Sequence, residues 1–348
     1  MGKYLESPSD WSRDSFFNLG GHSLLAVRLL SHIQQKFGQN LPLSIFFQSP
    51  TIEHLANILR VETDISQTWS PLVPIQPNGS KQPFFCVPGQ GGNVVYLYNL
   101  ARHIGTDQPF FSFQALGLDG ESEPHARIKD MASCYIEEMQ TVQPSGPYNL
   151  SGHSFGAFVA FEMAQQLQTR GQTVDLLAIL DIPAILPRNH PIEVERDDAQ
   201  WLTDIARVIE GLSGKTLGIL YESLTSLDWN QQLNFLKERM ETANLLPSGS
   251  GISQVRGIVQ VIKTAELALS RYKPRTGYAN QITLFRTAKP IQDKYGILNN
   301  DPDDETWGWS QLSTKPVKVI HLPGDHGTLM GEPHVQVLAE AIKDRVKG

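Results

Sequence analysis

The sequence predicts an α/β protein with a mostly parallel sheet, preceded by a small all-α unit. Two observations predict this fold class. Apolar residues recur at helical spacing before residue 64, whereas short apolar strand-like runs alternate with helix-like segments after residue 83. Between them, residues 69–82 (WSPLVPIQPNGSKQ) have the proline-rich composition of a linker. We therefore expect the small unit over residues 1–64, a linker over 65–79 and the larger unit over 80–348.

Composition is that of an ordinary folded protein with room for a large core. The chain has 348 residues, of which 40% are apolar and 19% charged, and a net charge of −7. This charge and the absence of a Lys/Arg-rich run argue against nucleic acid or an anionic membrane surface as a partner. No signal-peptide core or membrane-length apolar stretch occurs. Two cysteines, Cys86 and Cys134, are expected as buried free thiols, which favours a cytoplasmic location.

The small unit is expected to contain two helices. The first begins near Ser23, and its apolar stripe consists of Ala26, Leu30, Ile33 and Phe37. The second follows Thr51, a typical N-cap residue, and its stripe consists of Ile52, Leu55, Ala56 and Leu59.

The larger unit is expected to alternate strands with helices, which implies a mostly parallel sheet. The predicted strands are residues 83–87, 110–113, 147–150, 176–180, 282–285 and 317–322. Only helix-like stretches occupy the segment from about 182 to 275, so we expect a helical lid inserted above the sheet. Within it, GLSGKT (211–216) lacks the spacing of a phosphate-binding loop and is interpreted as a turn that ends a helix.

A nucleophile elbow is predicted at SGHSFGAF, where Gly152-x-Ser154-x-Gly156 joins a strand-like to a helix-like segment. Glycines recur at both flanks because side chains there would collide with the neighbouring strand or helix. The turn exposes the Ser154 hydroxyl and directs the Phe155 amide toward a developing oxyanion. Ser154 is therefore the candidate nucleophile.

A base and an orienting acid must activate this serine. His326, in the Gly-Asp-His-Gly turn after the last strand, is the candidate base, whereas His321 inside that strand is expected to be a core or surface residue. Asp325 adjoins His326 and is expected to point elsewhere. Asp181, at the end of LLAIL, is the favoured acid, and Asp293 after the ITLF strand is the alternative.

The second oxyanion donor should come from the Pro-Gly-rich loop after the first strand, FFCVPGQGGN. Such a loop lets backbone amides face the site. Gln90 is the predicted donor beside Phe155, and Gly91 could take its place.

Residues 80–348 resemble a type I thioesterase domain, the α/β hydrolase that releases product from nonribosomal peptide and polyketide synthases. The segments that carry the resemblance are LVPIQPNGSKQPFFCVPGQGG, YNLSGHSFGAFVAFEMA, LAILD and VIHLPGDHGTLM. In that family the acid commonly follows the strand after the elbow helix, which is the position of Asp181. The resemblance thus implies an α/β-hydrolase fold and a serine thioesterase.

The other Gly-His-Ser, in LGGHSLLA, lies in a different context. Leu25 occupies the place of the second elbow glycine, and Ser23 lies in a glycine-containing loop just before a helix. A helix N-terminus suits a phosphate and equally a plain capping serine. The pattern FFNLGGHSLLAVRLL…LPLSIFFQSPTIEHLA resembles a peptidyl carrier domain, in which this serine bears a covalent 4′-phosphopantetheine. Carriers of this family begin with a helix well before DSFF, so the first helix is expected to be shortened here.

Together the resemblances imply the terminal carrier–thioesterase didomain of a nonribosomal peptide synthetase. Such a didomain transfers a carrier-bound peptidyl or acyl thioester to its serine and releases it by hydrolysis or macrocyclisation. The implied partners are upstream synthetase domains and a phosphopantetheinyl transferase, and no metal is expected. The alternatives are a polyketide synthase release module and a non-catalytic carrier or docking scaffold.

Overall fold

The N-terminal unit is helical, as predicted. This computed structural model describes residues 11–16, 19, 23–39, 41, 45–48, 50–60, 70–186, 195–288, 298, 301 and 303–346. A 3₁₀ turn (η1, Trp11–Arg13) precedes the helices α1 (Ser23–Phe37), α2 (Ile45–Gln48) and α3 (Ile52–Arg60). The expected shortened first helix falls largely on residues 1–10, outside the described residues.

Both predicted helices of this unit form, and α2 is an addition. Thr51 caps α3, since its hydroxyl accepts the His54 N–H at 3.2 Å. The predicted stripes are right in their centres, where Ala26, Ile33 and Leu55 are buried. They are wrong at two ends, because Phe37 and Ile52 are each 60% exposed.

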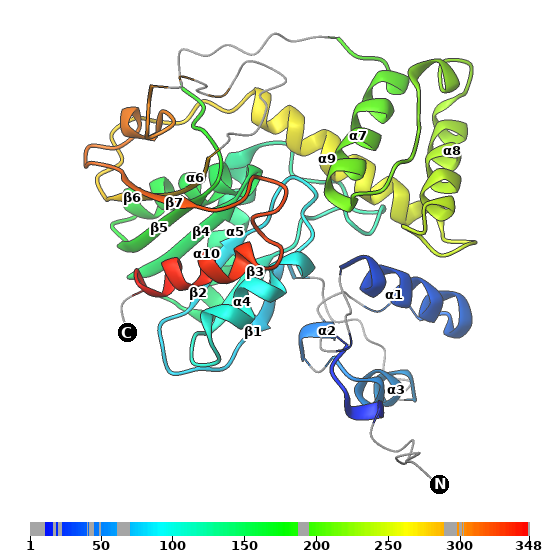
Figure 1. Cartoon of the computed structure of the whole chain (residues 1–348), viewed down its shortest axis with the longest axis horizontal. Coiled ribbons are helices and arrows are strands. Elements are labelled where there is room, and N and C mark those ends of the chain that lie inside the picture. Colours follow the sequence, from blue (N-terminus) through cyan, green and yellow to red (C-terminus); the bar gives the residue numbers. More distant parts are fainter. Residues whose placement is uncertain are drawn as a thin grey trace, which may run out of the picture.

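Over its described residues, the larger unit is built on a seven-stranded sheet in the order β1-β3-β2-β4-β5-β6-β7 (Figure 1). The strands are β1 (Leu72–Gln76), β2 (Phe84–Val87), β3 (Phe110–Phe113), β4 (Tyr148–His153), β5 (Val174–Leu180), β6 (Ile282–Thr287) and β7 (Lys318–Leu322). β1 pairs antiparallel with β3, and every other pair is parallel. The prediction of a mostly parallel sheet is confirmed.

The predicted linker over 65–79 is wrong for Leu72–Gln76, which forms β1. Pro74 lies within this strand. It is tolerated because β1 is an edge strand, where a missing N–H need not interrupt a ladder on both sides. Burial alternates along β1, with Val73 and Ile75 in the core, so this proline-containing segment belongs to the sheet.

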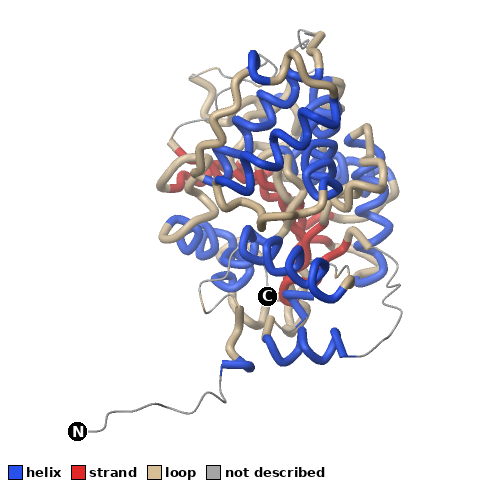
Figure 2. Tube along the Cα trace, turned by 90° about the vertical axis from the view of Figure 1, so that its right-hand side faces the viewer, coloured by secondary structure: helices blue, strands red, loops and turns tan. Residues whose placement is uncertain are grey.

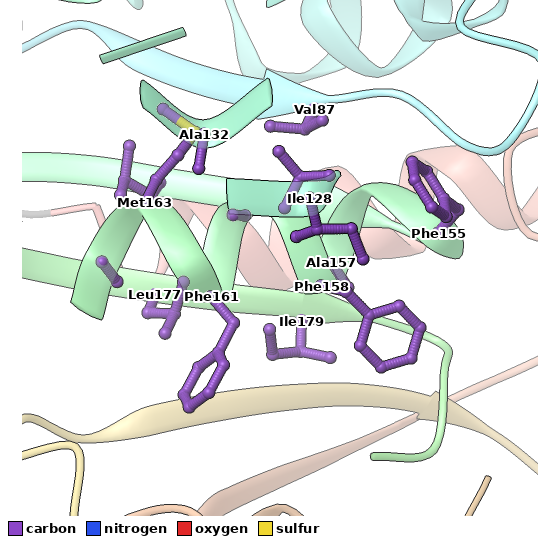
Figure 3. Packing of buried hydrophobic residues seen from close by; sticks show 14 of the residues in the cluster. Val87, Ile128, Ala132, Phe155, Ala157, Phe158, Phe161, Met163, Leu177 and Ile179 are labelled. Carbon is purple, nitrogen blue, oxygen red and sulfur yellow. The ribbon is translucent and has the colours of Figure 1, made fainter. Parts of the chain in front are cut away.

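Helices cover both faces of the sheet (Figures 1 and 2). On one face α4 (Tyr98–Ile104), preceded by the 3₁₀ turn η2 (Val95–Leu97), packs with α10 (His334–Lys343). On the other lie α5 (Ile128–Val142) and α6 (Phe155–Thr169). Figure 3 shows Phe158 and Phe161 of α6 near Leu177 and Ile179 of β5, within one buried cluster. Burial of nearly all of α6 fixes the turn that precedes it.

Between β5 and β6 the described residues form the predicted helical insertion, with α7 (Asp198–Ser213), the turn η3 (Tyr221–Ser223), α8 (Trp229–Thr242) and α9 (Ile252–Ser270). The three α-helices share an apolar core of their own. GLSGKT ends α7, with Gly214 in the left-handed conformation at its C-cap, as predicted. A last 3₁₀ turn, η4 (Trp309–Gln311), precedes β7. None of the helices described is both long and apolar enough to cross a membrane.

Candidate active site

Ser154 occupies a sharp turn between β4 and α6. Its φ of 54° and ψ of −128° are unusual for a residue with a side chain. Two backbone hydrogen bonds hold this turn. The Ser154 N–H donates to the Leu180 carbonyl at 3.1 Å, and the Ser154 carbonyl accepts from the Ala157 N–H at 2.9 Å. The predicted strand–turn–helix arrangement is present.

The flanking glycines are required by close approach. A Cβ at Gly156 would overlap the carbonyl oxygens of Val87 and Pro88, and one at Gly152 would overlap the Gly156 carbonyl. Since these are backbone atoms, they cannot move aside as a flexible side chain would. Both glycines let α6 begin directly against β2 and β4.

Substitution of Gly156 by alanine should therefore destabilise the protein. We expect Gly156→Ala to lower the free energy of unfolding by about 3 kcal/mol or more, because overpacking against backbone must displace α6 or β2. Gly211→Ala is the matched control, since nothing lies within 4 Å of its added Cβ in α7, and it should raise stability by about 0.5–1 kcal/mol. Urea denaturation of both variants measures the difference. Equal effects would contradict the steric explanation.

His326 joins Ser154 to Asp181. Its Nε2 lies 3.0 Å from the Ser154 Oγ, and its Nδ1 lies 3.0 Å from Asp181 Oδ2 and 2.8 Å from the Asp181 carbonyl. The Asp181 side chain is fully buried and that of His326 is 19% exposed. Nucleophile, base and acid candidates thus form one hydrogen-bonded chain.

Two strands fix Asp181. It directly follows β5 with a φ of 59°, and its N–H donates to the Phe285 carbonyl of β6 at 2.8 Å. The Thr287 N–H donates to its Oδ1 at 2.6 Å, which leaves Oδ2 for His326. This backbone donor at the end of β6 was not predicted. The alternative acid, Asp293, lies outside the described residues.

Asp325 and His321, which lie near His326 in the sequence, have partners outside the Ser154–His326–Asp181 chain, as expected. The Asp325 carboxylate accepts hydrogen bonds from the Thr328 hydroxyl and from the N–H groups of Thr328 and Gly327. These bonds, led by the one from the Thr328 hydroxyl, hold the pKa of Asp325 below its ordinary value. His321 is exposed and lies 3.0 Å from Glu305.

The candidate oxyanion donors lie on the start of α6 and on the loop after β2. Phe155 is the first residue of α6, so its N–H is among those that the helix itself leaves unpaired. On the other side runs the loop of residues 88–92, hereafter the oxyanion loop. A Cβ at Gly89 would lie 3.6 Å from the Ser154 Cβ, so this loop packs against Ser154 at Gly89. The next residue, Gln90, anchors the loop to the lid through its side-chain amide, which donates to the Ile262 carbonyl of α9 at 3.3 Å.

A small apolar cavity of about 30 Å³ opens beside this loop. It is lined by the loop itself, by the start of α6 and by side chains from α5 and the lid helix α9, including Tyr135, Phe155, Val159, Val261 and Ala265. The space next to the candidate oxyanion donors is therefore apolar.

Two residues of the site were missed from the sequence. Tyr96 and His153 form a hydrogen bond of 3.1 Å behind the oxyanion loop, and the His153 ring stacks on that of His326. His153 directly precedes Ser154 in the Gly-His-Ser tripeptide, so the sequence alone shows that it lies next to the nucleophile. The sequence does not show that Tyr96 is its hydrogen-bond partner, because Tyr96 lies 57 residues earlier in the chain.

Ser23 is the first residue of α1, as predicted. The four N–H groups at the start of a helix have no partner within it and form the positive end of its dipole. The first turn of α1 carries no acidic side chain. This position suits a negatively charged group attached to the serine.

Comparison with known protein families matches both parts of the chain. Residues 82–346 match the model of the thioesterase domain, and residues 5–59 match the model of the phosphopantetheine attachment site. Among similar proteins, indigoidine synthase of Dickeya dadantii is 44% identical over 341 residues, which covers 95% of this chain and 21% of that protein. The chondramide synthase of Chondromyces crocatus is 31% identical, over 96% of this chain and 8% of its own length. The chain thus spans less than a quarter of either relative.

Solved structures agree with this assignment. A four-domain nonribosomal peptide synthetase, holo-AB3403, is similar over 96% of this chain and 24% of its own, with a TM-score of 0.73 and 31% identity. The NocB thioesterase domain, solved as a covalent complex with a fluorophosphonate nocardicin G analogue, shares the fold of the larger unit, with a TM-score of 0.54 and 20% identity over 80% of this chain and all of its own. The chain therefore belongs to the thioesterase domain family, and its N-terminal unit is a phosphopantetheine attachment domain.

Proposed function

We propose that this chain bears an acyl or peptidyl thioester at Ser23 and releases it through Ser154, as the terminal part of a nonribosomal peptide synthetase. The observation that carries the proposal is the hydrogen-bonded chain Ser154–His326–Asp181 at the end of a parallel sheet. A carrier preceding a thioesterase, and relatives that include nonribosomal peptide synthases, support release of a peptide rather than a polyketide.

In the proposed reaction Ser154 Oγ attacks the thioester carbonyl while His326 Nε2 removes the hydroxyl proton. Asp181 holds the ring through Nδ1 and stabilises the imidazolium that forms. His326 then returns the proton to the departing thiolate, which leaves an ester on Ser154. Water, or a nucleophile within the acyl chain, resolves this ester by the same proton transfers, giving a free acid or a cyclic product.

The oxyanion of each tetrahedral intermediate is proposed to lie between the N–H groups of Phe155 and Gln90. The proposal is supported by the position of Phe155 directly after Ser154 at the start of α6, and by that of Gln90 directly after Gly89, whose added Cβ would lie 3.6 Å from the Ser154 Cβ. The apolar cavity beside them supports an acyl chain with a small apolar group near the reacting carbonyl.

Ser23 is the proposed point of attachment of 4′-phosphopantetheine. The phosphate of this group would face the unpaired N–H groups of the first turn of α1, and no acidic side chain there opposes it. When bound, the group supplies the thiol to which an acyl chain is joined. Its attachment requires a phosphopantetheinyl transferase, and upstream synthetase domains would load it. The free thiols Cys86 and Cys134 support a reducing, cytoplasmic setting.

Modification of Ser23 can be measured directly. Incubation with coenzyme A and a promiscuous phosphopantetheinyl transferase should add the mass of one arm to the wild-type chain, because Ser23 begins α1 within the residues that match the phosphopantetheine attachment site. Ser23→Ala should gain no mass, whereas Ser15→Ala, in the preceding loop, should be modified like wild type. Intact-mass spectrometry with peptide mapping gives the answer. Addition at any residue other than Ser23 would contradict the assignment.

A further inference from the structure

The Tyr96 hydroxyl links the oxyanion loop to His153, the last residue of β4. Its oxygen accepts the Gly89 N–H at 2.8 Å and lies 3.1 Å from His153 Nδ1. A hydroxyl has one proton, and a phenol whose oxygen already accepts one hydrogen bond can donate that proton to Nδ1. With the phenol as donor, the ring proton of a neutral His153 is on Nε2.

The Gly89 N–H determines how the oxyanion loop lies. Gly89 approaches Ser154 and the Tyr96–His153 pair together, since its added Cβ would lie 3.6 Å from the Ser154 Cβ, 3.6 Å from the Tyr96 oxygen and 3.7 Å from His153 Nδ1. A turn within the loop, Gly92 N–H to Gly89 carbonyl at 2.9 Å, ties the next residues to it. The Gly89 carbonyl and the Gln90 N–H share one planar peptide group, so the bond from Gly92 and the bond to Tyr96, on either side of the Gly89 Cα, together hold the direction of the Gln90 N–H.

His153 extends the connection to the base. Its ring is buried and stacks on His326, with centroids 5.2 Å apart and planes inclined by 19°. Burial, and then the neighbouring His326, hold the pKa of His153 well below its ordinary value. A neutral His153 can accept a hydrogen bond from the Tyr96 hydroxyl at Nδ1, and it does not repel His326 when that ring becomes positively charged.

A purely packing role would not need these polar groups. The His153 Nε2 is buried and has no hydrogen-bond partner among the residues described, and such an unpaired group costs stability. A phenylalanine would fill the space without that cost. Tyr96 and His153 instead connect a loop N–H, a hydroxyl and the stacked base.

We propose that Tyr96 and His153 are positioning residues, which hold the oxyanion loop and the His326 ring in a fixed arrangement relative to each other. This rests on the proposed function, because the loop and His326 must act on the same tetrahedral intermediate. The two residues act through Gly89 and the His326 ring and touch no reacting atom. Their loss should lower the rate of the chemical step and leave substrate binding nearly unchanged.

Tyr96→Phe removes the acceptor of the Gly89 N–H and the donor to His153. On an N-acetylcysteamine thioester we expect kcat to fall by about 10–100-fold, the range between slight misplacement and loss of one oxyanion donor, with KM within about twofold of wild type. The rate at which a fluorophosphonate probe labels Ser154 should fall by a similar factor. Tyr221→Phe is the matched control, because it loses a tyrosine hydrogen bond of 2.9 Å to Asp197 in the lid.

Two variants of His153 separate the hydrogen bond from the stack. His153→Phe keeps a flat ring and loses the acceptor, whereas His153→Asn keeps an acceptor near the position of Nδ1 and loses the ring. We expect His153→Phe to resemble Tyr96→Phe, the Tyr96→Phe/His153→Phe double variant to be no slower than either, and His153→Asn to recover part of the rate. If Tyr96→Phe fails to fold, a comparison of kcat between His153→Phe and His153→Asn still tests whether the hydrogen bond to Tyr96 matters.

The outcomes distinguish this proposal from the proposed function. A wild-type chain that the fluorophosphonate does not label at Ser154 would overturn the proposed function. A labelled wild type with Tyr96→Phe labelled at the same rate would overturn only the positioning role. A loss confined to KM, or a His153→Phe variant faster than His153→Asn, would also overturn it.

Discussion

Replacement of Ser154 by alanine is expected to lower kcat on an N-acetylcysteamine thioester by on the order of 10⁴–10⁶-fold. Without Oγ the His326 Nε2 at 3.0 Å has no proton to remove, and no ester can form. The fold should survive, because alanine is smaller and the turn is held by backbone hydrogen bonds of Ser154 to Leu180 and Ala157. Steady-state kinetics with circular dichroism of the same sample measures both.

Ser145→Ala provides the control for this change. Ser145 lies exposed just before β4, so its loss should leave kcat near that of wild type. A Ser154→Ala variant that retains more than a few per cent of the wild-type rate would show that the thioester is cleaved without a serine ester.

Asp181→Asn should lower kcat by about 10³–10⁴-fold while folding is retained. The reason lies in the two partners of the carboxylate. Oδ1 accepts the Thr287 N–H at 2.6 Å, so the oxygen of an asparagine amide would take that place. Its NH₂ group would then face His326 Nδ1, where it can only donate. Only the Asp181 carbonyl, 2.8 Å from Nδ1, would still accept the ring proton there, while the amide NH₂ favours the tautomer with the proton on Nε2, in which His326 cannot accept the Ser154 proton.

Two further variants test this assignment. Asp175→Asn alters an exposed carboxylate on the same strand, β5, and should leave kcat unchanged. Asp293→Asn, which alters the alternative acid, should also stay near wild type. Kinetics of the three variants ranks the carboxylates, and a large loss in Asp293→Asn with a small one in Asp181→Asn would transfer the role of acid.

The parts of the site that the sequence predicts are those set by short-range chemistry. The elbow depends on two glycines within five residues, and the backbone contacts of Gly152 and Gly156 show why. Asp181 could be placed because it ends an apolar strand, and parallel strands bring their carboxyl ends to one edge. The α1 start at Ser23 likewise follows from a local pattern.

What the sequence did not predict depends on contacts between distant segments. The Thr287 N–H reaches Asp181 across 106 residues, and the Tyr96–His153 bond spans 57. A backbone N–H is present in every residue except proline, so the residue type at position 287 does not indicate that this group donates to Asp181. β1 was missed for another reason, since the cost of a proline in a strand depends on whether that strand lies at an edge, which only the completed sheet determines.

Transfer of an acyl group from Ser23 to Ser154 is the central claim, and one mass-spectrometric measurement tests it most directly. A promiscuous transferase and an acyl-coenzyme A would load the chain with an acylated arm, and peptide mapping over time would follow the acyl mass. In wild type it should leave the Ser23 peptide, appear transiently on the Ser154 peptide and then be released. In Ser154→Ala it should remain on Ser23. Loss from Ser23 at the same rate in both chains, with no acyl mass on Ser154, would contradict the claim.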